Sequence, residues 1–446
     1  MGLDIFTEEA ASRFWDEQRR RVENAECGET IDFCDLAFPE DPQDKYFHGI
    51  HFVALADFSG ARFETGYVFE NVIFHNDLKL DNAVFKEDTG FDIVFEADAS
   101  FIETIFSGQV NFYSEFKGNA TFQNAIFKDY ASFGSMFADG PSKCIFKKGA
   151  VFDNAKFENV VTFRDTQFCA NTSFRDTEFK YWTNFNNVRF EGRTDFQYAK
   201  FEKYEGLETK RRNFVQFEKV IFADKVDFRG CIFRCKARFQ KVLFENTGEF
   251  RQAKFHENTE FIDVKANGRL FLERNYKALF TNSEDAIIPY RLAKLSTTAT
   301  GDLRWAGYYH YEEQCAINCQ QLKIAEWRPW KKAFYNWYRF GPLLLGEWLI
   351  GRWLFGYGEK PLRPLAGGAG VIIICAVLFC VFGGIKNDPN CSFWNCTYFS
   401  IVTFTTLGFG DFVPIASMRW LSATEAIFGA ALMSLFIVNL ARKFSR

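Results

Sequence analysis

Phenylalanine recurs along the first half of the chain at steps that alternate between five and six residues. The series is regular from Phe146, is interrupted by a polar stretch at residues 202–213, and resumes from Phe217 to Phe261. A small or β-branched residue stands two positions before nearly every Phe, with a polar residue between them, as in the Thr-Gln-Phe triplet that ends at Phe168. Residues two apart share one face of an extended chain, so each triplet places two side chains inward and one outward. The pattern predicts short strands, with Asn, Asp and Gly residues at the corners between them.

An eleven-residue unit that carries two Phe residues also has a helical alternative, the right-handed coiled coil. Steps of five and six residues would turn a helix by roughly 500° and 600°, so alternate Phe residues would lie on well-separated faces. No single apolar seam would result. We therefore expect strands that turn at each corner and stack as a β-solenoid, with the Phe side chains filling its axis.

The repeat resembles that of the pentapeptide-repeat proteins, whose square right-handed β-helix has a large central residue and a small one two positions before it. This chain departs from that period by adding one residue to every second unit. The resemblance implies a right-handed β-solenoid over residues 51–266, with roughly ten coils of about 4.8 Å each and a length on the order of 45 Å. Each coil buries its faces only against its neighbours, so both ends need caps. Residues 1–50, which include a charged amphipathic helix, are expected to cap one end.

After the repeat, residues 267–340 carry Leu, Ile and Tyr at helical spacing and predict a helical linker. Residues 341–364 contain two Trp residues, a type enriched at the membrane–water interface, together with Glu347 and Arg352. These charges make the segment a poor membrane span, so we expect an amphipathic helix on the membrane surface. The alternative is a buried helix of a soluble domain.

Two apolar runs of 21 residues, 365–385 and 420–440, are each long enough to cross a hydrocarbon core of roughly 30 Å. Lys and Arg residues gather before the first run and after the second, and the positive-inside rule then places both termini in the cytoplasm. The chain is thus expected to be multidomain. A cytosolic solenoid and a helical linker precede an all-α pore domain at residues 365–446, in the plasma (inner) membrane.

The segment between the two runs contains the sequence TTLGFGD, from Thr405 to Asp411, after an apolar stretch too short to cross the membrane. Non-helical backbone at membrane depth persists only where it is buried in protein or lines a water-filled path. Gly408 and Gly410 allow backbone angles that are closed to other residues, so successive carbonyl groups can point the same way. A column of such oxygens replaces the water shell of a cation, and four chains around a four-fold axis are needed to close it.

The order of outer helix, pore helix, TTLGFGD loop and inner helix closely resembles the pore domain of two-helix potassium channels, whose filter reads T-V-G-Y-G followed by Asp. The resemblance implies a homotetramer that passes K⁺ as its permeant ion and uses no cofactor. The residues implied to coordinate K⁺ through their carbonyl oxygens are Thr406, Leu407, Gly408 and Phe409, with the Thr406 hydroxyl as a further ligand. Thr405, Gly410 and Asp411 complete the matching segment. Phe409 stands where the family has Tyr, which removes a hydrogen bond behind the filter and bears on its rigidity.

Three further features of the pore segment leave alternatives open. Glu425 is costly in lipid, so it should face the helix bundle, either bracing the filter or serving as a hydrogen-bonded structural residue. Gly429 lies midway along the second run, where it either bends the helix during gating or packs closely against a neighbour. Cys391 and Cys396 lie on the outer, oxidising side, and a disulfide between them is predicted beside the alternative of two free thiols.

Composition excludes several other classes of protein. With a net charge of −4 and a pI near 5.9, the chain is not expected to bind nucleic acid. Five scattered His residues and twelve Cys residues without a C-x-x-C pair predict no metal site, and no nucleophile elbow or phosphate loop indicates an enzyme. The expected partners are the lipid membrane, K⁺ and further copies of the chain, together with an unidentified cytosolic partner of the solenoid.

Two other functions fit the same sequence: a non-selective cation channel, and a membrane-anchored interaction scaffold of the pentapeptide-repeat type. No Arg-rich voltage sensor precedes the pore, and no glycine fingerprint marks a regulatory nucleotide site. The opening stimulus is therefore not predicted. The solenoid is expected to have a regulatory or an assembly role.

Overall fold

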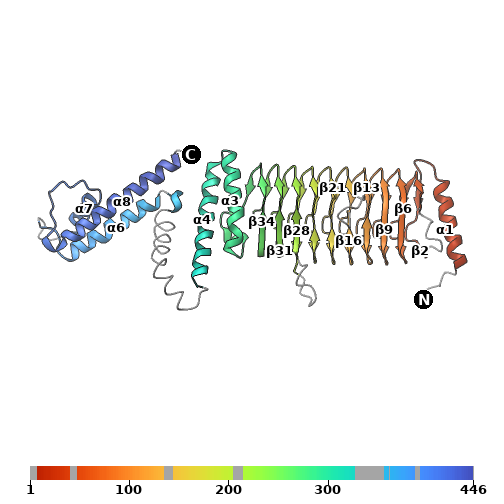
Figure 1. The fold of residues 1–446 in the computed structure, drawn as a ribbon, viewed down its shortest axis with the longest axis horizontal. Helices are drawn as coiled ribbons and strands as arrows, with labels where there is room; N and C mark the ends of the chain where they lie inside the picture. Colours follow the sequence, from red (N-terminus) through yellow and green to blue (C-terminus); the bar gives the residue numbers. More distant parts are fainter. Residues whose placement is uncertain are drawn as a thin grey trace. The chain divides into compact units, whose positions relative to one another are not determined.

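The computed structural model describes residues 8–40, 48–134, 144–203, 214–326, 356–360, 362–386 and 392–444. The chain divides into two compact units, Met1–Asp302 and Leu303–Arg446. The first unit is a parallel β-solenoid with a helix at each end (Figure 1). The second unit is helical. The predicted order of a β-solenoid followed by helices is confirmed, and the boundary between the two units falls inside the predicted linker 267–340.

The solenoid contains two parallel sheets, and most of its strands have only two residues. The 11-stranded sheet comprises β1 (Thr30–Asp32), β4 (Leu55–Asp57), β7 (Leu78–Lys79), β10 (Ala99–Ser100), β14 (Ala120–Thr121), β18 (Ala150–Val151), β22 (Thr172–Ser173), β26 (Thr194–Asp195), β30 (Val226–Asp227), β33 (Gly248–Glu249) and β36 (Leu270–Phe271). The 25-stranded sheet comprises β2 (Ala37–Phe38), β3 (His51–Phe52), β5 (Arg62–Phe63), β6 (Tyr67–Phe74), β8 (Val84–Phe85), β9 (Thr89–Phe95), β11 (Ile105–Phe106), β12 (Val110–Phe112), β13 (Glu115–Phe116), β15 (Ile126–Phe127), β16 (Ala131–Ser132), β17 (Ile145–Phe146), β19 (Lys156–Phe157), β20 (Val161–Thr162), β21 (Gln167–Phe168), β23 (Glu178–Phe179), β24 (Thr183–Asn184), β25 (Arg189–Phe190), β27 (Lys200–Phe201), β28 (Phe214–Glu218), β29 (Ile221–Phe222), β31 (Ile232–Gln240), β32 (Leu243–Phe244), β34 (Lys254–Ile262) and β35 (Lys265–Ala266).

The core of the solenoid consists of columns of Phe rings, as the spacing predicted. The ring of Phe174 stacks on Phe152 at 4.9 Å and on Phe196 at 4.8 Å, with interplanar angles of 8° and 6°. It meets Phe163 of a neighbouring column edge to face, at 5.3 Å and 79°. The stacking distance equals the spacing of hydrogen-bonded strands, about 4.8 Å, so ring packing and backbone pairing are satisfied by the same repeat. The small residues two positions before each Phe leave room for the rings, and Thr177 also donates a hydrogen bond of 2.8 Å to the Phe152 carbonyl.

Asn and Asp residues occupy corners of the coils, again as predicted. Their side chains tolerate the left-handed backbone conformation better than those of other non-glycine residues. In the regular part of the repeat these corners recur every eleven residues, at Asn154, Asp165, Asp176 and Asn187, with φ between 55° and 61°.

The solenoid begins earlier than the predicted residue 51 and ends later than residue 266. Its first strand is β1, and Phe33 and Phe38 stack on Phe58 and Phe63 at 4.4 Å and 4.8 Å, so they continue the same ring columns. The predicted N-terminal helix is α1 (Glu8–Glu23), and its buried Trp15 lies 5.4 Å from the Phe38 ring. This helix therefore covers the first coil (Figure 1).

Two helices cover the last coil, α2 (Tyr276–Leu279) and α3 (Ser283–Ala299). Phe280, between them, stacks on Phe255 at 4.9 Å and so ends one ring column. The buried Tyr290 of α3 donates a hydrogen bond of 2.6 Å from its hydroxyl to the Glu273 carbonyl. Beyond α3, Arg269 Nη1 lies 3.3 Å from the Asp302 carboxylate and fixes the end of this unit to the solenoid.

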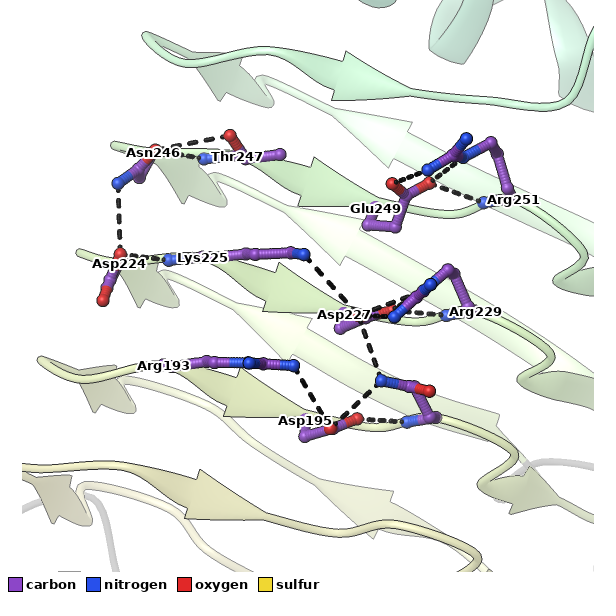
Figure 2. A network of polar contacts seen from close by, with 11 residues as sticks. Arg193, Asp195, Asp224, Lys225, Asp227, Arg229, Asn246, Thr247, Glu249 and Arg251 are labelled. Carbon is purple, nitrogen blue, oxygen red and sulfur yellow. Dashed lines mark hydrogen bonds and ion pairs between the residues drawn. The ribbon is translucent and has the colours of Figure 1, made fainter.

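Three successive strands of the 11-stranded sheet, β26, β30 and β33, carry a carboxylate at the same register position, and those of Asp227 and Glu249 are buried (Figure 2). Asp227 is fully buried, with Arg229 Nη2 at 2.8 Å and Lys225 Nζ at 3.9 Å, and Gln197 donates to it at 3.1 Å. Burial, and then the charge of Asp227, raise the pKa of the neighbouring Asp195 carboxyl. Both cations belong to the same coil as Asp227, and removing one would leave an uncompensated buried charge. The Gln197 hydrogen bond comes from the adjacent coil and links the two layers.

The helical unit contains α4 (Leu303–Glu326), the short turn η2 (Gly356–Gly358), α6 (Leu362–Val381), α7 (Phe393–Phe404), η3 (Ala416–Met418) and α8 (Arg419–Phe444). Both α6 and α8 are long and apolar enough to cross a membrane, which agrees with the two predicted spans. α6 starts at Leu362, inside the predicted 341–364 surface helix, and most of that predicted helix lies outside the described residues. The three helices α6, α7 and α8 pack on one another, with Phe379 and Phe399 in edge-to-face contact at 5.0 Å.

We expect Phe174→Ala to weaken the solenoid locally, because it opens a gap in a ring column whose neighbours cannot close it. The free energy that protects the amides of β22 and the adjacent coils from hydrogen–deuterium exchange should fall by about 3–5 kcal/mol. Lys156→Ala is the control, because Lys156 is exposed on the outer face of β19. Equal protection in the two variants would contradict the assignment of the Phe columns as the core.

Candidate ion-conduction site

The candidate site is the loop that follows the pore helix α7. The amides of Thr406 and Leu407 donate hydrogen bonds to the carbonyls of Thr403 and Val402, at 3.1 Å and 3.0 Å. The start of the loop is therefore held on the last turn of α7. From there to Asp411 the backbone has no regular structure, which is the arrangement expected for the TTLGFGD segment.

The backbone of this loop alternates in handedness. φ is positive at Thr406 (57°), Gly408 (59°) and Gly410 (79°), and the intervening Leu407 and Phe409 are not among the positive-φ residues. Such alternation turns successive peptide groups to the same side of the chain. A Cβ atom at either glycine would meet no atom within 4 Å, so backbone conformation is what requires glycine at both places.

The positive φ of Thr406 was not predicted from the sequence. A β-branched residue with positive φ is an outlier whose strain the surrounding structure has to maintain, and such residues cluster at functional sites. Its hydroxyl donates a hydrogen bond of 2.7 Å to the Thr405 carbonyl, and the hydroxyl lone pairs remain as candidate cation ligands. The pattern of glycines in the sequence gives no signal for a left-handed threonine.

The far end of the loop contacts the pore helix and the segment that follows α6. The Tyr398 hydroxyl of α7 hydrogen-bonds the Asp411 carboxylate, and the Tyr398 ring meets Phe412 at 5.9 Å. Ile385 and Pro414 form an isolated β-bridge. The amide hydrogen bonds of Thr406 and Leu407 hold the start of the loop, and these contacts hold its end. The side chains of Leu407 and Phe409, between the two ends, are exposed. The Tyr398–Asp411 bond was not predicted, since nothing in the sequence links these two positions.

Glu425 lies on α8 with its side chain buried against α7. Its carboxyl is hydrogen-bonded with the hydroxyl of Ser400, which also donates to the Ile372 carbonyl of α6 at 2.9 Å. One serine thus joins all three helices around the pore loop. Glu425 faces the bundle, as expected of a charge in a membrane span. Its contact is with the pore helix α7, which leads directly into the loop.

Gly429 allows α8 to approach the end of the pore helix closely. A Cβ atom there would lie 2.0 Å from the Phe404 carbonyl oxygen, and one at Gly368 of α6 would lie 2.9 Å from the Phe404 ring. The last residue of the pore helix is therefore held between two glycines. Gly429 fits the close-packing alternative, and α8 continues unbroken through it.

The remaining predicted site residues are placed as follows. Cys396 is buried in α7, and Cys391 lies outside the described residues, so their disulfide stays a prediction. Leu407 and Phe409 are 62% and 68% exposed in the single chain, which is unusual for large apolar side chains in a loop. Within the described ranges no group of three His, Cys, Asp or Glu residues is arranged to hold a metal ion.

Comparison with known families assigns the C-terminal part of the chain. Residues 369–446 match the family model described as ion channel. No curated protein and no solved structure matches the sequence. The chain therefore carries an ion-channel domain that contains α7, the loop and α8, joined to a β-solenoid with stacked Phe columns of the kind seen in pentapeptide repeats.

We expect Gly429→Ala to disrupt the pore domain, because the new methyl group would overlap the Phe404 carbonyl. Overpacking of this kind costs about 1–3 kcal/mol, and it should lower the thermal stability of the purified protein in detergent and reduce ion flux in liposomes. Gly370→Ala is the matched control. Gly370 lies on the other membrane helix, and a Cβ atom there meets nothing within 4 Å of the single chain. If the two variants behave alike, close packing at Gly429 is not needed.

Proposed function

We propose that the protein is a homotetrameric, K⁺-selective channel in the plasma membrane. In this proposal the carbonyl oxygens of Thr406, Leu407, Gly408 and Phe409, with the Thr406 hydroxyl, replace the hydration shell of K⁺. Ions cross passively, down their electrochemical gradient. The observation that carries the proposal is the alternating backbone at Thr406, Gly408 and Gly410, directly after a pore helix and between two membrane-spanning helices.

The alternating backbone supports selectivity through the energetics of dehydration. A cation that enters a narrow path gives up water ligands, and it does so readily only where protein oxygens take their place. Main-chain carbonyls on one side of the loop supply such oxygens at regular intervals. The chain departs from the potassium-channel filter at Leu407 and Phe409, and both residues keep their carbonyl groups.

The exposed loop supports assembly around an axis. A single chain supplies one edge of an oxygen column and leaves the apolar side chains of Leu407 and Phe409 open. Closed cyclic symmetry would surround the ion on all sides and cover these side chains with neighbouring subunits. Four chains is the number we propose.

Charge and aromatic residues support the orientation of the membrane helices. Lys360 precedes α6 and Arg363 lies in its first turn, and Arg442 and Lys443 lie in the last turn of α8, so basic residues gather at one side of the spans. Trp394 and Trp420 are 77% and 82% exposed near the opposite ends, where aromatic residues commonly meet the lipid interface. We infer that both termini are cytoplasmic and that the solenoid serves regulation or assembly there.

Reversal potentials of the purified protein in planar bilayers test the proposal. With a tenfold K⁺ gradient and Na⁺ balancing the ionic strength, the potential should approach the K⁺ equilibrium value of about 59 mV. Gly408→Ala should reduce this value, because alanine resists the left-handed backbone of the loop. Gly28→Ala is the control, since Gly28 also has a positive φ of 96° but lies in the solenoid unit.

A reversal potential near zero with Na⁺ present would indicate a non-selective cation channel instead. Absence of current together with a monomeric protein by light scattering would favour a membrane-anchored scaffold. An equal loss of selectivity in Gly408→Ala and Gly28→Ala would contradict the assignment of the loop as the filter.

A further inference from the structure

The turn η2, immediately before the first membrane helix, has an unusual backbone. Gly356 and Tyr357 both have positive φ, 56° and 52°. Glycine accepts this conformation readily, but a bulky aromatic residue holds it only where its surroundings enforce it. A Cβ atom at Gly356 would lie 2.9 Å from Cβ of Lys360, so the turn folds tightly back over the residues that lead into α6.

Two side chains of helix α4 contact Tyr357 and hold it in this conformation. The Asn318 side-chain amide donates a hydrogen bond to the Tyr357 hydroxyl, and the Tyr311 ring meets the Tyr357 ring at 5.8 Å. Tyr311 and Asn318 are two helical turns apart and so share one face of α4. Asn318 is only 6% exposed, so its amide has exchanged water for this contact.

The same Tyr311 ring contacts two cations, Lys360 just before α6 and Arg363 in its first turn. Lys360 Nζ lies 4.3 Å from the ring centroid, and the Arg363 guanidinium carbon lies 5.8 Å from it. Burial, and then the adjacent charge of Arg363, lower the pKa of the Lys360 ammonium. The face of the Tyr311 ring offsets part of the free-energy cost of burying the Lys360 charge, because the ring quadrupole attracts a cation. Tyr311, Asn318, Tyr357 and Lys360 together form what we call the Tyr357 junction.

The junction reaches both membrane helices. The turn η2 leads through Lys360 into α6, and it also contacts α8. Two helices that cross a membrane in opposite directions place the start of α6 and the end of α8 on the same side. We therefore infer that the junction contacts the C-terminal end of α8, the end farther from the candidate filter.

At its other end, α4 follows directly on a segment fixed to the solenoid. Arg269, in the last coil, donates to Thr300 Oγ1 at 3.1 Å and to the Asp302 carboxylate at 3.3 Å. Leu303, the next residue, is the first of α4. One helix thus begins at the end of the solenoid unit and carries Tyr311 and Asn318 farther along its length.

We propose that the Tyr357 junction is a gating element, which converts displacement of α4 into movement of the membrane helices at their inner ends. The inference rests on the proposed channel function and adds to it a route by which the solenoid regulates the pore. If α4 moves, it keeps its bonds to Tyr357 only by moving the turn, and the turn is covalently joined to α6. The strained backbone at Tyr357 favours release of the turn once those bonds break.

Single-channel recording of the full-length protein tests the inference. Tyr357→Phe removes one oxygen atom and the Asn318 hydrogen bond while keeping the ring, so the closed–open equilibrium should shift by about threefold to tenfold. Asn318→Ala should shift it in the same direction. Unit conductance and the K⁺ reversal potential should match the unchanged chain, because the filter is not altered. Tyr198→Phe is the control, since Tyr198 is an exposed tyrosine of the solenoid.

Wild-type open probability in both junction variants, with K⁺ selectivity intact, would overturn the junction and leave the proposed channel function standing. Hydrogen–deuterium exchange in lipid nanodiscs gives a readout that does not need current. Tyr357→Phe should speed exchange in the last turns of α8 by a similar factor. Unchanged exchange there would also overturn the inference, even if the protein carried no K⁺ current.

Discussion

Main-chain polar groups that leave water need a partner, and both units of this protein are built around that requirement. In the solenoid, the partner of each two-residue strand is the coil before or after it, as where the Phe174 amide donates to the Asp195 carbonyl at 2.7 Å. In the helical unit, the helices pair their own backbone groups, whereas none of the backbone hydrogen bonds of the described residues is accepted by the carbonyls of Thr406 to Phe409. The channel function we propose follows from that exception, because carbonyls without a protein partner are free to hold a cation.

The sequence predicted the parts of the fold that depend on repetition or on length. Alternating Phe steps were enough for the solenoid and its Asn and Asp corners, and 21-residue apolar runs were enough for α6 and α8. The first coil was missed because Phe33 and Phe38 are recognised as members of the columns only once they are seen to stack on Phe58 and Phe63. Contact in space, rather than spacing along the chain, defines that boundary.

The parts of the candidate site that were predicted are those where the residue type alone indicates a role. Gly408 and Gly410 marked the loop, and a buried charge marked Glu425 as facing the bundle. The contacts with Ser400 and between Tyr398 and Asp411 depend on how three helices pack, so no local pattern could have given them. The same holds for the Tyr357 junction, whose members come from two segments that are far apart in sequence.

The coil length has a consequence for how this protein can change in evolution. Phe157 pairs with Phe179 and Phe179 with Phe201, so one coil in this region takes 22 residues. Duplicating 22 residues would add a layer without altering the angular phase of the two ends, and α1 and α3 would still find their matching faces. Duplicating eleven would rotate one end by half a turn relative to the other. Solenoids of this design should therefore differ in size among relatives by whole coils.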